Sequence, residues 1–68
     1  MKSRVKEMME DQKVTVRVLA EKQSMTIRTI MKARDDNHIR NCRLGTLEKI
    51  AQALGCRVKD LFEENEEG

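Results

Sequence analysis

The sequence predicts a compact all-α domain built from five short helices. Its 68 residues are too few for a second hydrophobic core, so we expect a single domain. The chain has no proline and only three glycines, which leaves few turn-forming residues for a multi-stranded β fold. Phe62 is its one aromatic residue, so the core must be assembled from Leu, Ile, Val, Met and Ala, which suit helices better than sheets.

The first two helices are predicted from capping residues and apolar spacing. One helix is expected over about residues 2–11, with Ser3 as its N-cap. A second helix of about two turns is expected to follow Thr15, a good N-cap, and to end near residue 22. The apolar positions are Val5, Met8 and Met9 in the first helix, and Val16, Leu19 and Ala20 in the second.

A third helix is predicted from Thr26, its N-cap, to about residue 34. The pattern breaks over residues 23–25, which leaves room only for a tight turn. Residues 35–45 have no helical period and are rich in turn formers, so we expect a loop there. The apolar positions of this helix are Ile30 and Met31 and, less regularly, Ile27 and Ala33.

Two further helices and a tail complete the prediction. Thr46 is expected to cap the fourth helix, and Gly55 stands where a left-handed C-cap is expected. A last short helix follows, and the acidic, apolar-poor residues 64–68 are expected to form a flexible tail after a domain of residues 1–63. The apolar positions are Leu47, Ile50, Ala51 and Leu54, then Val58, Leu61 and Phe62.

The composition excludes several function classes. No apolar run approaches the length of a membrane span or a signal peptide, so we expect a cytoplasmic protein without a membrane partner. Cys42 and Cys56 form neither a disulfide framework nor a Cys-x-x-Cys motif, so both are interpreted as reduced thiols, and no metal or cofactor is expected. With one histidine, His38, and scattered acids, no catalytic pair emerges, and we do not expect an enzyme.

Charge is segregated along the chain. Residues 13–43 carry eight basic residues against three acidic ones, a local charge of +5. Residues 44–68 carry three basic residues against six acidic ones, a local charge of −3. A basic first part is typical of a nucleic-acid surface, although solvated helix faces would explain the same charges.

Residues 15–35 have the spacing of a helix-turn-helix. Two helices that cross steeply need a small residue at their closest approach and an apolar residue in the turn between them. Ala20 supplies the first, beside Leu19, and Met25 supplies the second, ahead of Ile30 and Ala33. The methionines would suit an adaptable binding surface, but Met8, Met9, Met25 and Met31 all stand at core spacing, which favours a role as gap-fillers in the core.

Over residues 3–62 the chain resembles the Cro and lambda-repressor-like family, also called the XRE family. The most specific stretch runs from Leu44 to Phe62 and supports the fold more than any contact. The motifs are Thr15-x-x-x-Leu19-Ala20-Glu21-Lys22, Thr26-x-x-Thr29-Ile30, Leu44-Gly45-Thr46-Leu47-Glu48-Lys49-Ile50-Ala51-Gln52-Ala53-Leu54-Gly55-Cys56 and Val58-Lys59-Asp60-Leu61-Phe62.

The resemblance implies a compact five-helix domain that binds double-stranded DNA and regulates transcription, as a repressor. It places the third helix in the major groove and the second helix across the backbone. Ile27 remains open between a base contact and a core position, because it also lies three residues before Ile30. By position, the implied base contacts are Ile27, Arg28, Thr29 and Lys32, and the implied phosphate contacts are Thr15, Arg17, Thr26, Arg40, Asn41 and Arg43.

The sequence departs from the family pattern at several positions. Val16 stands where the family often has a glutamine that braces the third helix or touches DNA, so that polar contact is absent. Ser24 replaces the usual turn glycine and must accept a left-handed conformation if the turn is unchanged. Asp35 and Asp36 would repel phosphate unless they turn away from it.

The resemblance also implies a homodimer on a palindromic operator, since one such module offers limited contact area. Leu61 and Phe62 are the candidate interface, but closure of the core would use them equally well. The alternative function is a protein-binding antitoxin or anti-repressor module that keeps the fold and uses its last helix and acidic tail.

Overall fold

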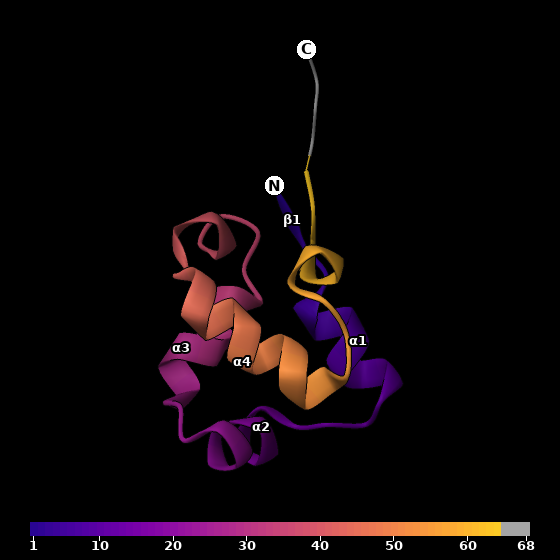
Figure 1. The fold of residues 1–68 in the computed structure, drawn as a ribbon, viewed down its shortest axis with the longest axis vertical. Helices are drawn as coiled ribbons and strands as arrows, with labels where there is room; N and C mark the ends of the chain where they lie inside the picture. The colour runs from indigo at the N-terminus through magenta and orange to yellow at the C-terminus, as the bar shows by residue number, and fades with distance from the viewer. Residues whose placement is uncertain (65–68) are drawn as a thin grey trace.

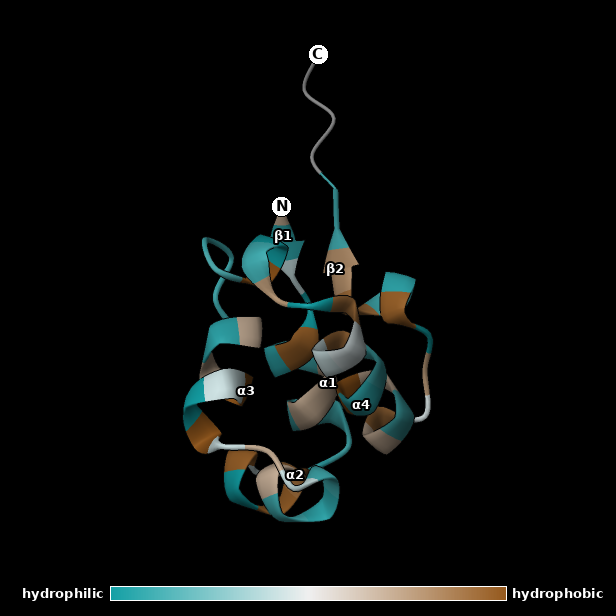
Figure 2. Ribbon diagram, turned by 60° about the vertical axis from the view of Figure 1, so that its left-hand side comes forward, coloured by the Kyte–Doolittle hydropathy of each residue, from teal (hydrophilic) through white to brown (hydrophobic). Residues whose placement is uncertain are grey.

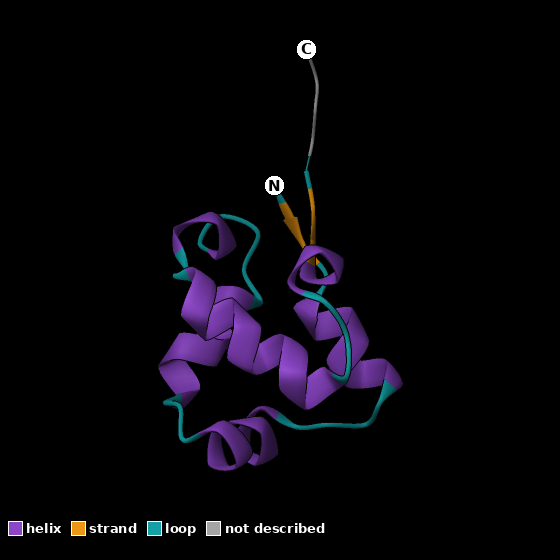
Figure 3. Ribbon diagram, in the orientation of Figure 1, coloured by secondary structure: helices purple, strands orange, loops and turns teal. Residues whose placement is uncertain are grey.

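The computed structural model describes residues 1–64 of the chain. Within them α4 crosses the middle of the molecule, and the three earlier α-helices lie around it (Figure 1). The two strands pair with each other near the N-terminus, in the upper part of the view (Figure 3). The elements are β1 (Lys2–Ser3), α1 (Val5–Asp11), α2 (Val16–Gln23), α3 (Ile27–Ala33), the 3-10 helix η1 (Ile39–Asn41), α4 (Leu44–Leu54), the 3-10 helix η2 (Val58–Leu61) and β2 (Phe62–Glu63).

The expected count of five α-helices is wrong, because the described residues form four. The last predicted helix is the four-residue 3-10 helix η2. Its hydrogen bonds span three residues: the Asp60 N–H donates to the Arg57 carbonyl at 2.9 Å, and the Asp60 carboxylate accepts from the Arg57 N–H at 3.1 Å. The chain is extended again at Phe62, where it pairs with β1, so the segment has no room to continue as an α-helix.

The start of the chain also differs from the prediction. Ser3 is not a helix N-cap, because β1 pairs antiparallel with β2 and places Ser3 opposite Phe62. The Ser3 hydroxyl donates to the carbonyl of Ala33 at the end of α3. Arg4, the residue before α1, donates its N–H to the Leu61 carbonyl at 2.7 Å. The N-terminal segment therefore ties the end of α3 to η2 and β2.

Three helices end in the same backbone conformation. Lys13, Ser24 and Gly55 have φ values of 57°, 54° and 68°, the left-handed region. After each of them the next N–H bonds back across the last turn: Val14 to Met9 at 2.8 Å, Met25 to Ala20 at 2.9 Å and Cys56 to Ala51 at 3.0 Å. Both the Gly55 C-cap and the left-handed Ser24 are confirmed, and the Lys13 turn was not predicted.

One core joins all the helices. α4 packs against α2 and η2, and α2 packs against α3. Hydrophobic and hydrophilic segments alternate along the helices (Figure 2), as expected where each helix buries a single face. No polar side chain of residues 1–64 is buried. The core residues are Val5, Met9, Leu19, Ala20, Ile30, Ala33, Ile39, Leu47, Ile50, Ala51, Leu54 and Leu61.

The predicted loop before α4 is held in place by one apolar side chain. Ile39, in η1, is 1% exposed and belongs to the core. α4 then begins at Leu44 after Arg43, so the prediction of Thr46 as its N-cap is wrong. Thr46 is the third residue of α4, and a residue with a helical backbone inside the first turn cannot be the N-cap, which stands before the helix. Because Ile39 is held in the core, η1 and Arg43 lie close to the C-terminal part of α3.

Within residues 1–64, no helix combines the length and apolarity that crossing a bilayer requires.

The left-handed positions give a stability prediction. A residue with a Cβ costs about 1–2 kcal/mol in this conformation, of which about 0.5–1 kcal/mol is offset because glycine loses more backbone entropy on folding. Lys13→Gly and Ser24→Gly should each raise the free energy of unfolding by about 0.5–1 kcal/mol, whereas Gly55→Ala should lower it by about 1 kcal/mol. Urea denaturation followed by circular dichroism measures all three, and an unchanged or lower stability of both glycine variants would contradict the assignment.

Candidate nucleic-acid interface

The helix-turn-helix is built from two similar helix starts and one tight turn. The Thr15 hydroxyl accepts from the Val18 N–H at 3.1 Å, and the Thr26 hydroxyl accepts from the Thr29 N–H at 3.2 Å. Both predicted N-caps are therefore confirmed. Met25 is partly buried against the core between the two helices, in the position predicted for it.

The orientation of α3 follows from its two buried residues. Ile30 and Ala33 are completely buried and hold one side of the helix against the core. Successive residues of an α-helix are turned by about 100°, so Arg28 points almost directly away from this pair. Lys32 lies beside Arg28 on the exposed side, one turn further along. α3 thus presents a guanidinium and an ammonium group to solvent from the middle of its outer face.

The two residues on the other side of Arg28 are apolar. Ile27 is 48% exposed, so it is not a core residue. Met31 is 50% exposed, and its predicted core position is wrong. The sequence spacing suited a core residue, but Met31 is four residues after Ile27 and lies on the same side of the helix. The Met31 sulfur accepts from Arg34 Nη1 at 3.7 Å, within the reach of a weak sulfur contact.

Thr29 lies at the border between the buried and exposed sides of α3. Its hydroxyl shares a hydrogen bond of 2.8 Å with the Thr26 hydroxyl, and its side chain is half-buried. Thr29 therefore supports the N-terminal turn of α3 and offers less free surface than Arg28 or Lys32.

The structure brings α3 together with the segment that precedes α4. Thr29 and Lys32 line one shallow hollow with Asn41 and Arg43. A neighbouring hollow joins Arg28, Lys32 and Met31 to Lys6 of α1, a basic residue that the sequence did not single out. Lys6 belongs to the first helix and carries no local pattern, so only the fold places it near α3. The six predicted phosphate contacts, all exposed, lie before or in α2, before α3, and in or after η1: Thr15, Arg17, Thr26, Arg40, Asn41 and Arg43.

The two acidic residues after α3 are held by local hydrogen bonds. Asp36 Oδ1 accepts from the Ser3 N–H at 2.8 Å. Asp35 Oδ1 accepts from the Asn37 N–H at 3.1 Å, and Asp35 Oδ2 pairs with His38 Nδ1. The Asn37 N–H and His38 hold the pKa of Asp35 below its ordinary value, so this carboxylate stays ionised at neutral pH. Both acids are thus engaged with the protein itself.

The cysteines carry no reactive signature. Partial burial raises the pKa of both the Cys42 and the Cys56 thiol, so each stays protonated at neutral pH. Both are free, and the described residues include no group of three or more His, Cys, Asp or Glu side chains that could hold a metal.

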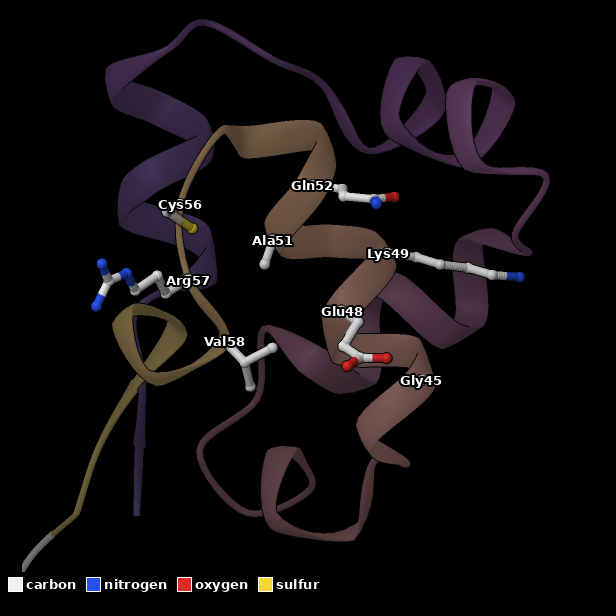
Figure 4. A pocket seen from close by; sticks show the side chains of 8 residues that line it. All are labelled: Gly45, Glu48, Lys49, Ala51, Gln52, Cys56, Arg57 and Val58. Atoms are coloured by element: carbon white, nitrogen blue, oxygen red, sulfur yellow. The ribbon is translucent and has the colours of Figure 1, made fainter.

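A further hollow lies between α4 and the segment that leads into η2 (Figure 4). Figure 4 shows Lys49 and Gln52 extending to one side of it and Arg57 to the other. Glu48 is the one acid that lines it, and the protonated Cys56 lines it at a separate place (Figure 4). This arrangement offers no nucleophile activated by a base.

The two candidate interface residues differ in exposure. Leu61 is completely buried in the core, so its side chain has no surface to offer a partner. Phe62 is half-buried, packs against the core and belongs to β2. Of the two alternatives for this pair, closure of the core therefore accounts for Leu61. The predicted acidic tail, residues 64–68, falls outside the described residues except for Glu64.

Comparison with known proteins agrees with this geometry. A family model described as the Cro/C1-type HTH DNA-binding domain matches residues 4–67. The match includes α2, the turn and α3, together with α4 and η2. Searches of the curated proteins and of the solved structures give no match. Since the family model covers nearly the whole chain, the resemblance seen in the sequence is confirmed, and the chain belongs to the Cro/C1-type HTH DNA-binding domain family.

Proposed function

We propose that this protein binds double-stranded DNA at specific sequences and represses transcription there, with α3 in the major groove. One observation carries the proposal: the outer face of α3 presents Arg28 opposite the buried Ile30 and Ala33, with Lys32 beside it. An α-helix fits the major groove, and its outward side chains then meet the base edges. The proposal assigns the protein no enzymatic activity, metal or cofactor.

Arg28 is assigned the main base contact. A guanidinium can donate two parallel hydrogen bonds to O6 and N7 of guanine, a pairing worth about 1–3 kcal/mol of discrimination. Lys32 follows one turn later and can reach a second guanine. Ile27 and Thr29, at the start of α3, complete the proposed base-contacting set.

The proposed phosphate contacts surround α3. Thr15, Arg17 and Thr26 lie at the starts of α2 and α3, where the second helix of such a motif crosses the backbone. Asn41 and Arg43 lie next to Lys32 in one hollow, and Arg40 is exposed in η1, directly before Asn41. Contacts of this kind set affinity, position and salt dependence, and base contacts set the sequence.

We further propose a homodimer on a palindromic operator. A single domain of this size contacts one half-site, whereas two copies related by a two-fold axis contact two half-sites about 34 Å apart. Occupancy of such an operator excludes the transcription machinery from it, which is the proposed mode of repression.

The first test is a fluorescence-anisotropy titration with the DNA upstream of the protein's own gene and with a scrambled duplex. The upstream duplex should bind about 1,000-fold more tightly than the scrambled one near physiological salt. Non-specific binding to phosphates should weaken steeply as salt rises, while the preference persists. Equal binding of both duplexes, with joint release by salt, would leave only an electrostatic patch and exclude sequence-specific binding.

The second test removes the outward charges of α3. Arg28→Ala combined with Lys32→Ala should weaken binding to the preferred duplex by at least about 30-fold, the factor for two lost contacts of about 1 kcal/mol each. The matched control is Arg57→Ala combined with Lys59→Ala, which removes the same two charges from exposed positions of η2 and the residue before it. Equal losses in both double variants would show that total charge, and not the face of α3, determines binding.

The third test counts protein copies on the DNA. Sedimentation velocity with a palindromic duplex should give a complex of two protein chains per duplex, and a duplex with one half-site scrambled should bind more weakly. A single chain per duplex at saturating protein would reject the dimeric mode while leaving DNA binding by α3 intact.

A further inference from the structure

The outer face of α3 carries two large apolar side chains that the core does not use. Ile27 and Met31 are about half exposed, at 48% and 50%. They are four residues apart, so they lie one above the other along the same side of Arg28. Lys32 lies on the opposite side of Arg28. The exposed face of α3 therefore has an apolar edge and a basic edge.

The protein itself does not explain this apolar edge. The core holds α3 through Ile30 and Ala33. Burial of a full Met or Ile side chain is worth about 1.5–3 kcal/mol, so half of that stabilisation is left unused at each position. An occupant that covers both side chains from outside would recover it.

The charges around the edge indicate which occupant fits. The hollow beside Met31 is lined by Lys6, Arg28, Lys32 and Arg34, and its acid, Asp35, is engaged by Asn37 and His38. The occupant must therefore be anionic and must also present apolar groups at the same depth as hydrogen-bond acceptors. The major groove at A·T pairs meets this description, because thymine places its 5-methyl group there among base acceptors and between phosphates.

From this complementarity we propose that Ile27 and Met31 determine sequence specificity by contacting thymine methyl groups. Of the two, Met31 is the residue that its sequence spacing alone would assign to the core. The inference rests on the DNA-binding function proposed above and adds the bases that the apolar edge selects. Met31 is unbranched and polarisable, so it adapts to a methyl group, whereas the β-branched Ile27 presents a stiffer surface.

The spacing of the two residues limits where the thymines lie. Four residues of α-helix rise about 6 Å. Base pairs are spaced by about 3.4 Å along the duplex. Two thymine methyl groups contacted by Ile27 and Met31 therefore lie within about two base-pair steps of one another, on the apolar side of the guanine assigned to Arg28.

The experiment compares thymine with deoxyuridine, which differs only by the methyl group. A tight duplex is first selected from a random pool with the wild-type protein. Each thymine of the selected half-site is then replaced singly by deoxyuridine, and affinities are measured for the wild-type protein and for Met31→Ala. Because one methyl group is worth about 0.8 kcal/mol, deoxyuridine at the contacted thymine should weaken the wild-type complex about fourfold.

Met31→Ala should abolish the effect at that one thymine, so that the variant binds the thymine duplex and the deoxyuridine duplex with affinities within about 1.5-fold of each other. Met31→Leu should restore the methyl preference, since leucine keeps the apolar volume. Arg28→Ala is the matched control: it should weaken both duplexes and keep the fourfold ratio between them. Because half of the Met31 side chain is already exposed, Met31→Ala should still fold cooperatively, with a melting temperature several degrees below that of the wild type.

Two results would overturn the inference. In the first, the wild-type protein binds every deoxyuridine duplex with the same affinity as the thymine duplex. This measurement does not depend on the folding of any variant. The other is a Met31→Ala protein that keeps the wild-type ratio at every thymine. In either case a tightly bound duplex still exists, so the proposed DNA binding would survive. Failure of the selection to enrich any duplex would instead remove the proposed function and this inference together.

Discussion

The burial of Ile30 and Ala33 against the core is the constraint on which the rest of the molecule depends. Both side chains are completely buried, as are Leu19 of α2 and Ile50 of α4. Because α3 has seven residues, two buried side chains are enough to fix its rotation. That rotation determines which residues face outward, and it places Arg28 opposite the core. A core without a buried ring must hold this orientation through close aliphatic packing, where the loss of even one methylene group is felt.

The same core also positions the surroundings of α3. Ile39 draws the segment before α4 against the core and so fixes Asn41 and Arg43 next to Lys32. At the C-terminal end of α3, the Ser3 hydroxyl donates to the Ala33 carbonyl and the Ser3 N–H donates to Asp36 Oδ1, which fixes the position of this exposed carboxylate. The basic surface around α3 thus depends on two short segments outside the helix: η1, which follows it, and the N-terminal segment with Ser3, which is far from it in the sequence.

Most of the fold could be predicted because its signals are local. Thr15 and Thr26 are N-caps, Gly55 ends a helix, and the apolar stripe of α4 points to one core. The differences arise where tertiary contacts decide. A two-residue strand is too short to show a periodic pattern, so the local sequence around Ser3 and Phe62 does not predict that these residues pair. Met31 has the spacing of a core residue, but the core beneath α3 is already filled by Ile30 and Ala33. Lys6 joins the basic surface only through the packing of α1.

The most direct measurement of the central claim is amide chemical-shift mapping by NMR, with ¹⁵N-labelled protein and a selected duplex. The account predicts that the largest changes fall in α3 from Ile27 to Lys32, at the starts of α2 and α3, and over Arg40–Arg43. Residues of η2 and β2 should change little, apart from any effect of dimer formation at Phe62. Changes concentrated on η2 and β2, with α3 unaffected, would contradict the account and would indicate a surface for another partner.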